Sequence, residues 1–344
     1  MWVILLLRKI IGLTVCFLLL LCCSAYAFEY NVSAQCAVLM DAATGEVLYE
    51  KNAETEHPMA STTKIMTCLL ACESGKLGKA VTVTDEMLHG LEGTSLDLTV
   101  GDSITLYDLV QGAILESGND AANAIAVYLG GSTAQFAEMM NERAKAIGMV
   151  HTLFVTPSGL DEGEHHTTAY DMALLAAEAL KNGTFAAICD TADAVITVNG
   201  TPKAITNHNK LLKVSGGFTG VKTGFTKKAG RCLVSSYCYH GSTMICVTLN
   251  APNDWDDHIN LINQAKKEYT IYSDSDTLTI PTAEAGLSSV PCTYHYSIAA
   301  LDIVDCKLYY YPFLYAPYTA GNTVGYVEII SDGKVIGKTD IIIQ

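Results

Sequence analysis

The chain has 344 residues, of which half are hydrophobic, and it carries a formal net charge of −15. This length and composition allow one large domain with a sizeable core and a second, smaller domain. A nucleic-acid-binding protein needs a basic face, so the acidic balance argues against that class and we expect no nucleic-acid partner.

The first 27 residues are typical of an export signal. Arg8 and Lys9 precede an uninterrupted apolar run, and Ala25-Tyr-Ala27 matches the small-residue pattern of a cleavage site. We therefore expect an exported protein whose mature chain begins near Phe28 and lies at the cell wall or the outer face of the cytoplasmic membrane. The residues from Trp2 to Leu7 are also apolar. An uncleaved N-terminus that holds the protein peripherally at the membrane is therefore the alternative.

Nine of the twelve cysteines follow this signal, and their odd number and wide spacing do not indicate a disulfide framework. Cys68 and Cys72 lie one helical turn apart, but no matched pair of metal ligands accompanies them, so we interpret them as small core residues. The sequence contains no zinc, phosphate-loop or dinucleotide-binding signature. We expect neither a metal nor an organic cofactor.

The large domain is predicted to begin with a β-hairpin around Asp41-Ala-Ala-Thr-Gly45. A helix is expected over 61–74, where apolar residues recur at helical spacing: Ile65, Cys68, Leu69 and Cys72. Further helices are expected over 106–114, 120–129, 133–147 and 168–180, the last capped by Thr167 or Thr168. Alternating segments then predict strands over 194–198, 219–223, 231–239 and 243–250. A final helix is expected over 256–269.

This order of a hairpin, several helices and then strands predicts the α+β class, with an antiparallel sheet to which the hairpin and the last helix return. From about Asp274 the chain becomes rich in β-type segments, which predicts a small all-β domain. The predicted organisation is therefore a signal peptide at 1–27, a large domain at 28–273 and a β-rich domain at 274–344.

Ser61-Thr-Thr-Lys64 has the residues of a serine nucleophile and its base. A serine hydroxyl needs a base to become nucleophilic, and at a helix start Lys64 lies on the same face as Ser61. To lower a lysine pKa from roughly 10.4 to about 7, the surroundings must destabilise its charged form by about 4.6 kcal/mol. Burial and a neighbouring positive charge, for which Lys222 is a candidate, can supply this. The helix N-terminus also presents N–H groups to a reacting carbonyl.

Two further strings add complementary groups. Ser117-Gly-Asn119 offers a hydroxyl for proton relay and an amide that can hold a substrate backbone. In Lys222-Thr-Gly224, Lys222 and Gly224 share one strand face, and the glycine allows close approach of a substrate backbone. Lys222 and Thr223 could together bind a carboxylate. Each string alone is common, but the ordered set indicates acyl transfer on a substrate with a free carboxylate.

Ser331-Asp-Gly-Lys334 also matches the Ser-x-x-Lys pattern. It lies between two β-type segments, and Asp-Gly is a strong signal for a two-residue hairpin turn. A hairpin tip is a poor place for a nucleophile, so we predict that this copy is only a turn.

The segment from Gly217 to Val234 closely resembles the serine-type D-alanyl-D-alanine carboxypeptidases, the low-molecular-mass penicillin-binding proteins. Four shorter segments resemble the same family: 59–66, 115–122, 156–161 and 166–171. The resemblance covers roughly residues 32–269. It implies a β-lactamase/transpeptidase-like domain, with an antiparallel sheet and helices on both faces, followed by the small β-rich domain.

The resemblance implies an exported hydrolase of cell-wall biogenesis that removes the terminal D-Ala from peptidoglycan stem peptides ending in D-Ala-D-Ala. It also implies that β-lactam antibiotics acylate and inhibit the enzyme, and that no cofactor is required. The implied site has Ser61 as the acylated nucleophile, Lys64 as its base, Ser117 as a proton relay and Asn119 as a ligand of the substrate amide. Lys222, Thr223 and Gly224 would receive the substrate end, and the N–H groups of Ser61 and Phe225 would form the oxyanion hole.

One departure from the family concerns the substrate carboxylate. Many relatives have a carboxylate-binding arginine after the Lys-Thr-Gly string, where this chain reads Asn253-Asp-Trp-Asp-Asp-His258. His258 or Arg231 could replace it, or Lys222 and Thr223 could suffice.

Three other functions remain as alternatives. A class A β-lactamase shares the three-motif plan, but this chain has no Glu-x-x-Leu-Asn string between Ser117 and Lys222 for the deacylating water. A D,D-endopeptidase would use the same atoms. The alternative from a different class is a penicillin-binding sensor or wall-binding module with little turnover.

Overall fold

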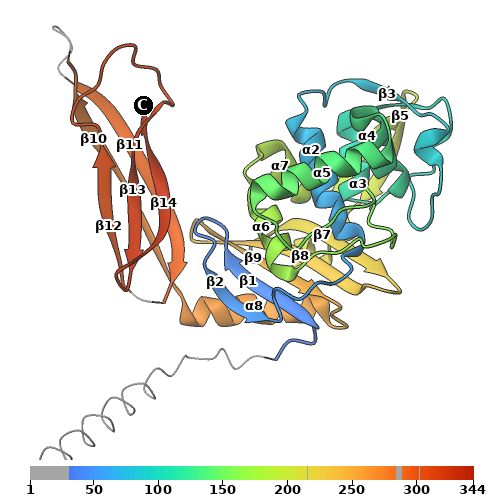
Figure 1. Ribbon diagram of the computed structural model, residues 1–344, viewed down its shortest axis with the longest axis horizontal. Coiled ribbons are helices and arrows are strands. Elements are labelled where there is room, and N and C mark those ends of the chain that lie inside the picture. Colours follow the sequence, from blue (N-terminus) through green and yellow to red (C-terminus); the bar gives the residue numbers. More distant parts are fainter. Residues whose placement is uncertain (1–30, 215, 284–288, 302) are drawn as a thin grey trace, which may run out of the picture. The chain divides into compact units, whose positions relative to one another are not determined.

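The computed structural model describes residues 31–214, 216–283, 289–301 and 303–344 (Figure 1). The predicted signal peptide lies outside these ranges. In the described part of the chain, no single helix is both long and apolar enough to cross a membrane. The helices α6 (Ala169–Leu180) and α7 (Gly183–Cys189) meet that criterion only as a pair bent by 112°.

The large domain is organised around an antiparallel sheet with the strand order β2-β1-β9-β8-β7. Its strands are β1 (Cys36–Asp41), β2 (Val47–Lys51), β7 (Phe218–Thr226), β8 (Gly230–Tyr239) and β9 (Ser242–Leu249). The N-terminal hairpin joins the late strands because β1 pairs along its whole length with β9, from Cys36 opposite Leu249 to Asp41 opposite Met244. The predicted return of the hairpin to the sheet is therefore confirmed.

Helices cover both faces of this sheet, as predicted (Figure 1). Side chains alternate along each strand, so Val38, Val234 and Val247 point into a core shared with the helices α2 to α7. On the opposite face lies α8 (Asp254–Glu268), which packs on β8 and β9. The α+β class is confirmed.

The helical region contains α2 (Lys64–Glu73), α3 (Leu106–Ile114), α4 (Asn119–Gly130) and α5 (Thr133–Ile147), followed by α6 and α7. Side-chain caps begin several of these helices. Thr168, for example, accepts a hydrogen bond from the Asp171 N–H at the start of α6, which confirms one of the two predicted caps. Seven of the ten residues of α2 are buried, so this helix runs through the core and carries its first residue, Lys64, into the interior.

A second small sheet lies beside the helices, with the order β3-β4-β5-β6. Its strands are β3 (Ala80–Thr82), β4 (Ser103–Thr105), β5 (Asp193–Val198) and β6 (Thr201–Thr206). The sequence analysis found only β5 and missed the other three strands and α7. Of these, β3 and β4 have three residues each, too few positions to show an alternating pattern.

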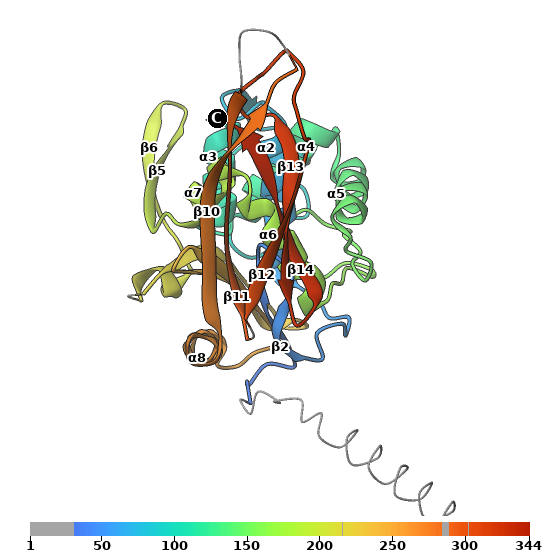
Figure 2. The same cartoon turned by 90° about the vertical axis from the view of Figure 1, so that its left-hand side faces the viewer.

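The C-terminal region forms a sheet with the order β10-β11-β14-β13-β12 (Figure 2). Its strands are β10 (Thr270–Pro281), β11 (Ser289–Ala300), β12 (Val304–Tyr310), β13 (Thr323–Ser331) and β14 (Lys334–Ile343), and it has its own core. The first strand starts at Thr270, so the predicted domain boundary at 274 lies inside β10. Ser331 pairs with Lys334 across a two-residue turn in which Asp332 and Gly333 have φ values of 47° and 72°. The predicted hairpin is confirmed.

Candidate active site

Ser61 lies in a single 3₁₀ turn, η1 (Ala60–Thr63), that leads directly into α2. The residue before it, Ala60, has a φ of +49°, which is uncommon for a residue with a Cβ atom. The helix predicted over 61–74 therefore begins with a 3₁₀ turn and becomes an α-helix only at Lys64. Ser61 itself is partly exposed, whereas its three neighbours in the turn are buried.

Lys64 is fully buried, and its Nζ atom makes three hydrogen bonds. It donates to Ser61 Oγ at 2.9 Å, to Asn119 Oδ1 at 2.6 Å and to the Ser158 carbonyl at 2.6 Å. Burial, and next the positive charge of Lys222, hold the pKa of Lys64 well below its ordinary value. This contact and the lowered pKa allow Lys64 to serve as a base for the Ser61 hydroxyl.

Ser117 and Asn119 lie at the junction of α3 and α4. Ser117 has a left-handed φ of 63°, and Asn119 is the first residue of α4. The Asn119 backbone N–H donates to the Thr94 carbonyl at 2.8 Å, and its Nδ2 donates to the Glu92 carbonyl. An amide nitrogen carries two hydrogens, so Nδ2 keeps one donor for the cleft while Oδ1 receives Lys64.

The third segment is β7, which packs directly against the turn that carries Ser61. Lys222 is almost fully buried, donates to the Thr223 carbonyl at 3.0 Å, and has a pKa lowered to about 8 by burial. A Cβ atom on Gly224 would lie 3.0 Å from Ser61 N and 3.1 Å from the Met59 carbonyl oxygen. The glycine therefore permits close packing of β7 on the turn that carries Ser61, whereas close approach of a substrate backbone at Gly224 stays a prediction.

These segments border a cleft of about 450 Å³. Its lining includes six of the eight predicted site residues: Ser61, Ser117, Asn119, Thr223, Gly224 and Phe225. The other two, Lys64 and Lys222, are buried beside it. The structure thus brings all the predicted site residues together from three distant parts of the chain.

The cleft also contains residues that sequence reasoning did not identify. His208, Lys210 and Trp255 line it. Nothing in the sequence near His208 or Lys210 signals a site. Trp255 belongs to the segment that departs from the family pattern, and that departure was the available signal.

Arg231 lies on β8 opposite Phe225 and lines the cleft. Its Nη2 donates to Asp254 Oδ1 at 2.8 Å, and its guanidinium lies 5.6 Å from the centre of the Trp255 ring. Its buried Nε has no hydrogen-bond partner among the described residues. Asp254 is nearly buried, so it holds the guanidinium at the cleft wall.

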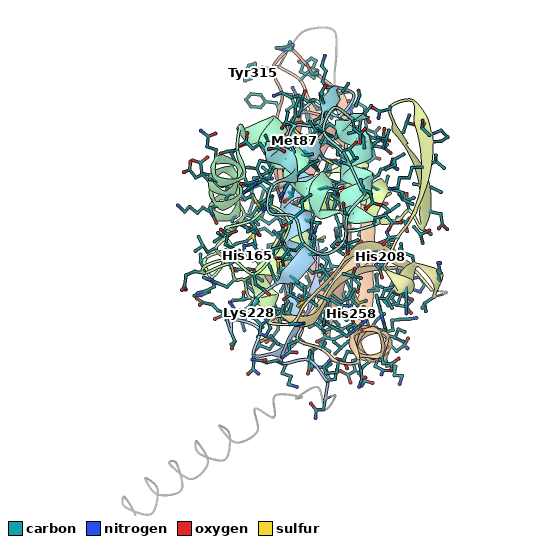
Figure 3. All side chains as sticks on the ribbon, turned by 90° about the vertical axis from the view of Figure 1, so that its right-hand side faces the viewer. Met87, His165, His208, Lys228, His258 and Tyr315 are labelled. Atoms are coloured by element: carbon teal, nitrogen blue, oxygen red, sulfur yellow. The ribbon has the colours of Figure 1, made fainter. Side chains whose placement is uncertain are left out.

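His258 is a different case, and the structure excludes it as a replacement for the arginine. It is fully buried between the sheet and α8 (Figure 3). Its ring is hydrogen-bonded to Ser235 Oγ at 2.6 Å and Thr248 Oγ1 at 2.9 Å. Burial lowers its pKa to about 3, so it is a neutral link between α8 and the sheet. Of the two candidates, only Arg231 reaches the cleft.

A comparison with known families matches residues 24–253 to the model described as D-alanyl-D-alanine carboxypeptidase. The chain belongs to this family of serine peptidases. One relative is the D-alanyl-D-alanine carboxypeptidase DacF of Bacillus subtilis (strain 168), which is 31% identical over 91% of this chain and 85% of its own length.

Solved structures of family members agree with this assignment. Penicillin binding protein 5 from Haemophilus influenzae is 25% identical with a TM-score of 0.70, covering 92% of this chain and 98% of that one. The Streptomyces K15 DD-transpeptidase is 29% identical with a TM-score of 0.65, covering 69% of this chain and 98% of that one. The predicted family resemblance is confirmed, and this chain is a serine-type carboxypeptidase of that family.

Proposed function

We propose that this protein removes the terminal D-Ala from peptidoglycan stem peptides through an acyl-enzyme at Ser61. The observation that carries the proposal is the contact between Ser61 Oγ and the buried Lys64 Nζ at 2.9 Å, at the edge of the cleft. A lysine with a depressed pKa can act as a base near neutral pH, which an exposed lysine cannot do.

In the acylation step, Ser61 Oγ attacks the carbonyl carbon of the penultimate D-Ala while its proton passes to neutral Lys64. The N–H groups of Ser61 and Phe225 receive the charge that develops on the carbonyl oxygen. The proton then moves to the leaving D-Ala nitrogen, with Ser117 as the relay, and the C–N bond breaks. Water hydrolyses the resulting ester and regenerates the serine.

Recognition of the terminal carboxylate is assigned to Lys222, Thr223 and Arg231. Arg231 is held at the cleft wall by Asp254, and its guanidinium can form charge-assisted hydrogen bonds to a carboxylate. Asn119 holds the substrate backbone. The Arg231 guanidinium, although paired with Asp254, has further N–H groups at this end of the cleft, which favour substrates with a carboxylate beside the scissile bond.

β-Lactams present a strained amide and a nearby carboxylate, so the same groups would accept them and Ser61 would be acylated. We further propose that the protein is exported by its N-terminal segment and acts in cell-wall biogenesis outside the cytoplasmic membrane. The sequence pattern of residues 1–27 supports this localisation.

The test uses the purified mature protein with a labelled penicillin and with a peptide ending in D-Ala-D-Ala. We expect covalent labelling and release of free D-Ala by the wild type, and neither by Ser61→Ala. The matched control is Ser331→Ala, which removes the serine of the second Ser-x-x-Lys copy and should behave as the wild type.

Other results would identify the alternatives. Labelling without D-Ala release would indicate a sensor, and fast penicillin turnover a β-lactamase. Cleavage of cross-linked dimers at a rate equal to that for the free peptide would indicate an endopeptidase. Absence of both labelling and cleavage in the wild type would overturn the proposal.

A further inference from the structure

The peptide that joins Ala60 to Ser61 is enclosed on two sides by glycines. A Cβ atom on Gly159 would lie 1.9 Å from the Ala60 carbonyl oxygen, and a Cβ atom on Gly224 would lie 3.0 Å from Ser61 N. In a trans peptide the C=O and N–H bonds point in opposite directions. Whatever fixes the Ala60 carbonyl beside Gly159 therefore also fixes the direction of the Ser61 N–H beside Gly224, and both glycines line the cleft.

A chain of three hydrogen bonds holds that carbonyl. The Thr63 hydroxyl donates to the Ala60 oxygen at 2.8 Å. His165 Nε2 lies 2.8 Å from the same hydroxyl oxygen. The Val155 N–H donates to His165 Nδ1 at 2.9 Å.

The direction of these hydrogen bonds follows from the groups at the two ends of the series, the Val155 N–H and the Ala60 carbonyl. A backbone N–H can only donate, so His165 Nδ1 is an acceptor and the proton of the neutral ring is on Nε2. The Nε2–H then donates to Thr63 Oγ1, which leaves the hydroxyl hydrogen for the Ala60 carbonyl. Burial, and then the charges of His166 and Lys228, lower the pKa of His165 to about 4, so the ring is neutral at neutral pH.

The anchored residue needs such support. Ala60 has a φ of +49°, a conformation that a residue with a Cβ atom adopts only when its surroundings impose it. Thr63 and His165 are both buried, so their hydrogen bonds do not compete with water.

We propose that His165 is a positioning residue, which acts through Thr63 on the Ala60 carbonyl and thereby directs the Ser61 N–H into the cleft as an oxyanion donor. The inference rests on the proposed acylation of Ser61. It assigns to the 152–168 loop a role in the transition state, in addition to its contact with Lys64 through the Ser158 carbonyl.

The first test separates kcat from KM for release of D-Ala. Removal of one oxyanion donor typically lowers kcat about 10²–10³-fold, and a misdirected donor loses part of this. We expect His165→Phe, which keeps a ring against Phe154, and Thr63→Val each to lower kcat about tenfold or more with KM within about twofold. His165→Gln and Thr63→Ser, which retain the donor groups, should recover most of the rate.

The matched control is Thr67→Val. Thr67 lies one turn further along α2 and also donates from a buried hydroxyl to the loop, to the Pro157 carbonyl at 2.7 Å. This variant should lower the melting temperature about as much as Thr63→Val while leaving kcat within about twofold. Equal losses of kcat in the Thr63 and Thr67 variants would show a loosened loop and overturn the proposal.

The second test observes the imidazole directly. In a two-bond ¹H–¹⁵N NMR spectrum of the full chain, the resonance that His165→Gln removes should show a proton on Nε2 and none on Nδ1 between pH 6 and 8. A proton on Nδ1 would reverse the direction of the hydrogen bonds between Val155, His165 and Thr63 and would overturn the proposal. The double variant of His165→Phe with Thr63→Val should be no slower than either single variant, because both substitutions break the same series of hydrogen bonds.

The two proposals fail differently. If the wild type neither labels with penicillin nor releases D-Ala, the proposed function fails. If the wild type does both and His165→Phe changes only KM or only the melting temperature, the positioning role alone fails.

Discussion

Ser61-Thr-Thr-Lys64 and Ser331-Asp-Gly-Lys334 have the same spacing of serine and lysine but lie in different surroundings. The first opens a buried helix, and its lysine is fully buried with three hydrogen-bond acceptors. The second is a hairpin turn with an exposed lysine. Burial lowers a lysine pKa, so the comparison shows that the surroundings, and not the pattern, give Lys64 the lowered pKa that the proposed base needs.

The largest expected difference between the two Ser-x-x-Lys strings is the change in kcat when the lysine of each is replaced. We expect Lys64→Met to lower kcat for D-Ala release about 10²–10⁴-fold, the usual contribution of a general base. Lys334→Met should leave kcat unchanged. Steady-state kinetics on the same D-Ala-D-Ala peptide measures both, and a Lys64→Met enzyme with more than a tenth of the wild-type rate would contradict the assignment of the base.

Substitution of one glycine near each Ser-x-x-Lys string extends the comparison. Gly224→Ala places a methyl group 3.0–3.1 Å from backbone atoms of the Ser61 turn, so that turn must shift. A shift of the nucleophile by about 1 Å can lower the rate about 10²-fold. Penicillin labelling rates should reveal this loss.

The hairpin supplies the control for that substitution. A Cβ atom on Gly333 would meet nothing within 4 Å, but the residue has a φ of +72°. Gly333→Ala should therefore lower the unfolding free energy by about 1–2 kcal/mol and leave labelling unchanged. If Gly224→Ala labels at the wild-type rate, the close packing of β7 on the nucleophile turn is not required for activity.

The cations around the Ser61 cleft provide the next test. We expect Arg231→Leu to lower kcat/KM about 10- to 100-fold for a peptide with a free terminal carboxylate, because a charge-assisted hydrogen bond is lost. The same peptide with a C-terminal amide should show a much smaller difference between the two enzymes. Lys227→Leu removes an equal charge from an exposed position in the nearby turn and should change neither value. An equal loss on acid and amide would remove Arg231 from carboxylate recognition.

The smallest expected effect is on the pH profile. Lys64 must be neutral to act as a base, so kcat/KM should rise with pH through its lowered pKa. Lys222 must be charged to bind the carboxylate, and its pKa is lowered to about 8, so kcat/KM should fall again as the pH rises through about 8. Lys222→Arg should move this basic limb upward, since a guanidinium stays protonated. A limb unmoved by that substitution belongs to another group.

Much of the fold could be predicted because hydrophobic spacing is local. The run of apolar residues in α2 and the alternation in β8 and β9 identified these elements and their type. The three-residue strands β3 and β4 could not be predicted, because they form by pairing with segments distant in the sequence. In contrast, β6 pairs with its neighbour β5 across Asn199-Gly200, a local hairpin signal that the sequence analysis did not use.

In the candidate site, too, only the contacts between residues close in the sequence could be predicted. Ser61 and Lys64 share a helix face, so their contact follows from spacing alone. The exclusion of His258 was also within reach, because it repeats at helical spacing with Leu261, Ile262 and Ala265, on the buried side of α8. No local pattern links Lys64 to Ser158, or His165 to Thr63, because these pairs are about a hundred residues apart.

The sequence by itself therefore determined the chemical groups of this protein, the order of most of its elements and the family to which it belongs. Only the tertiary structure decided which of two Ser-x-x-Lys strings is buried, which cation reaches the cleft and what holds the peptide before Ser61. The physical reason is that a pKa, a donor direction and a close approach depend on the neighbours that the fold assembles, and those neighbours come from distant segments.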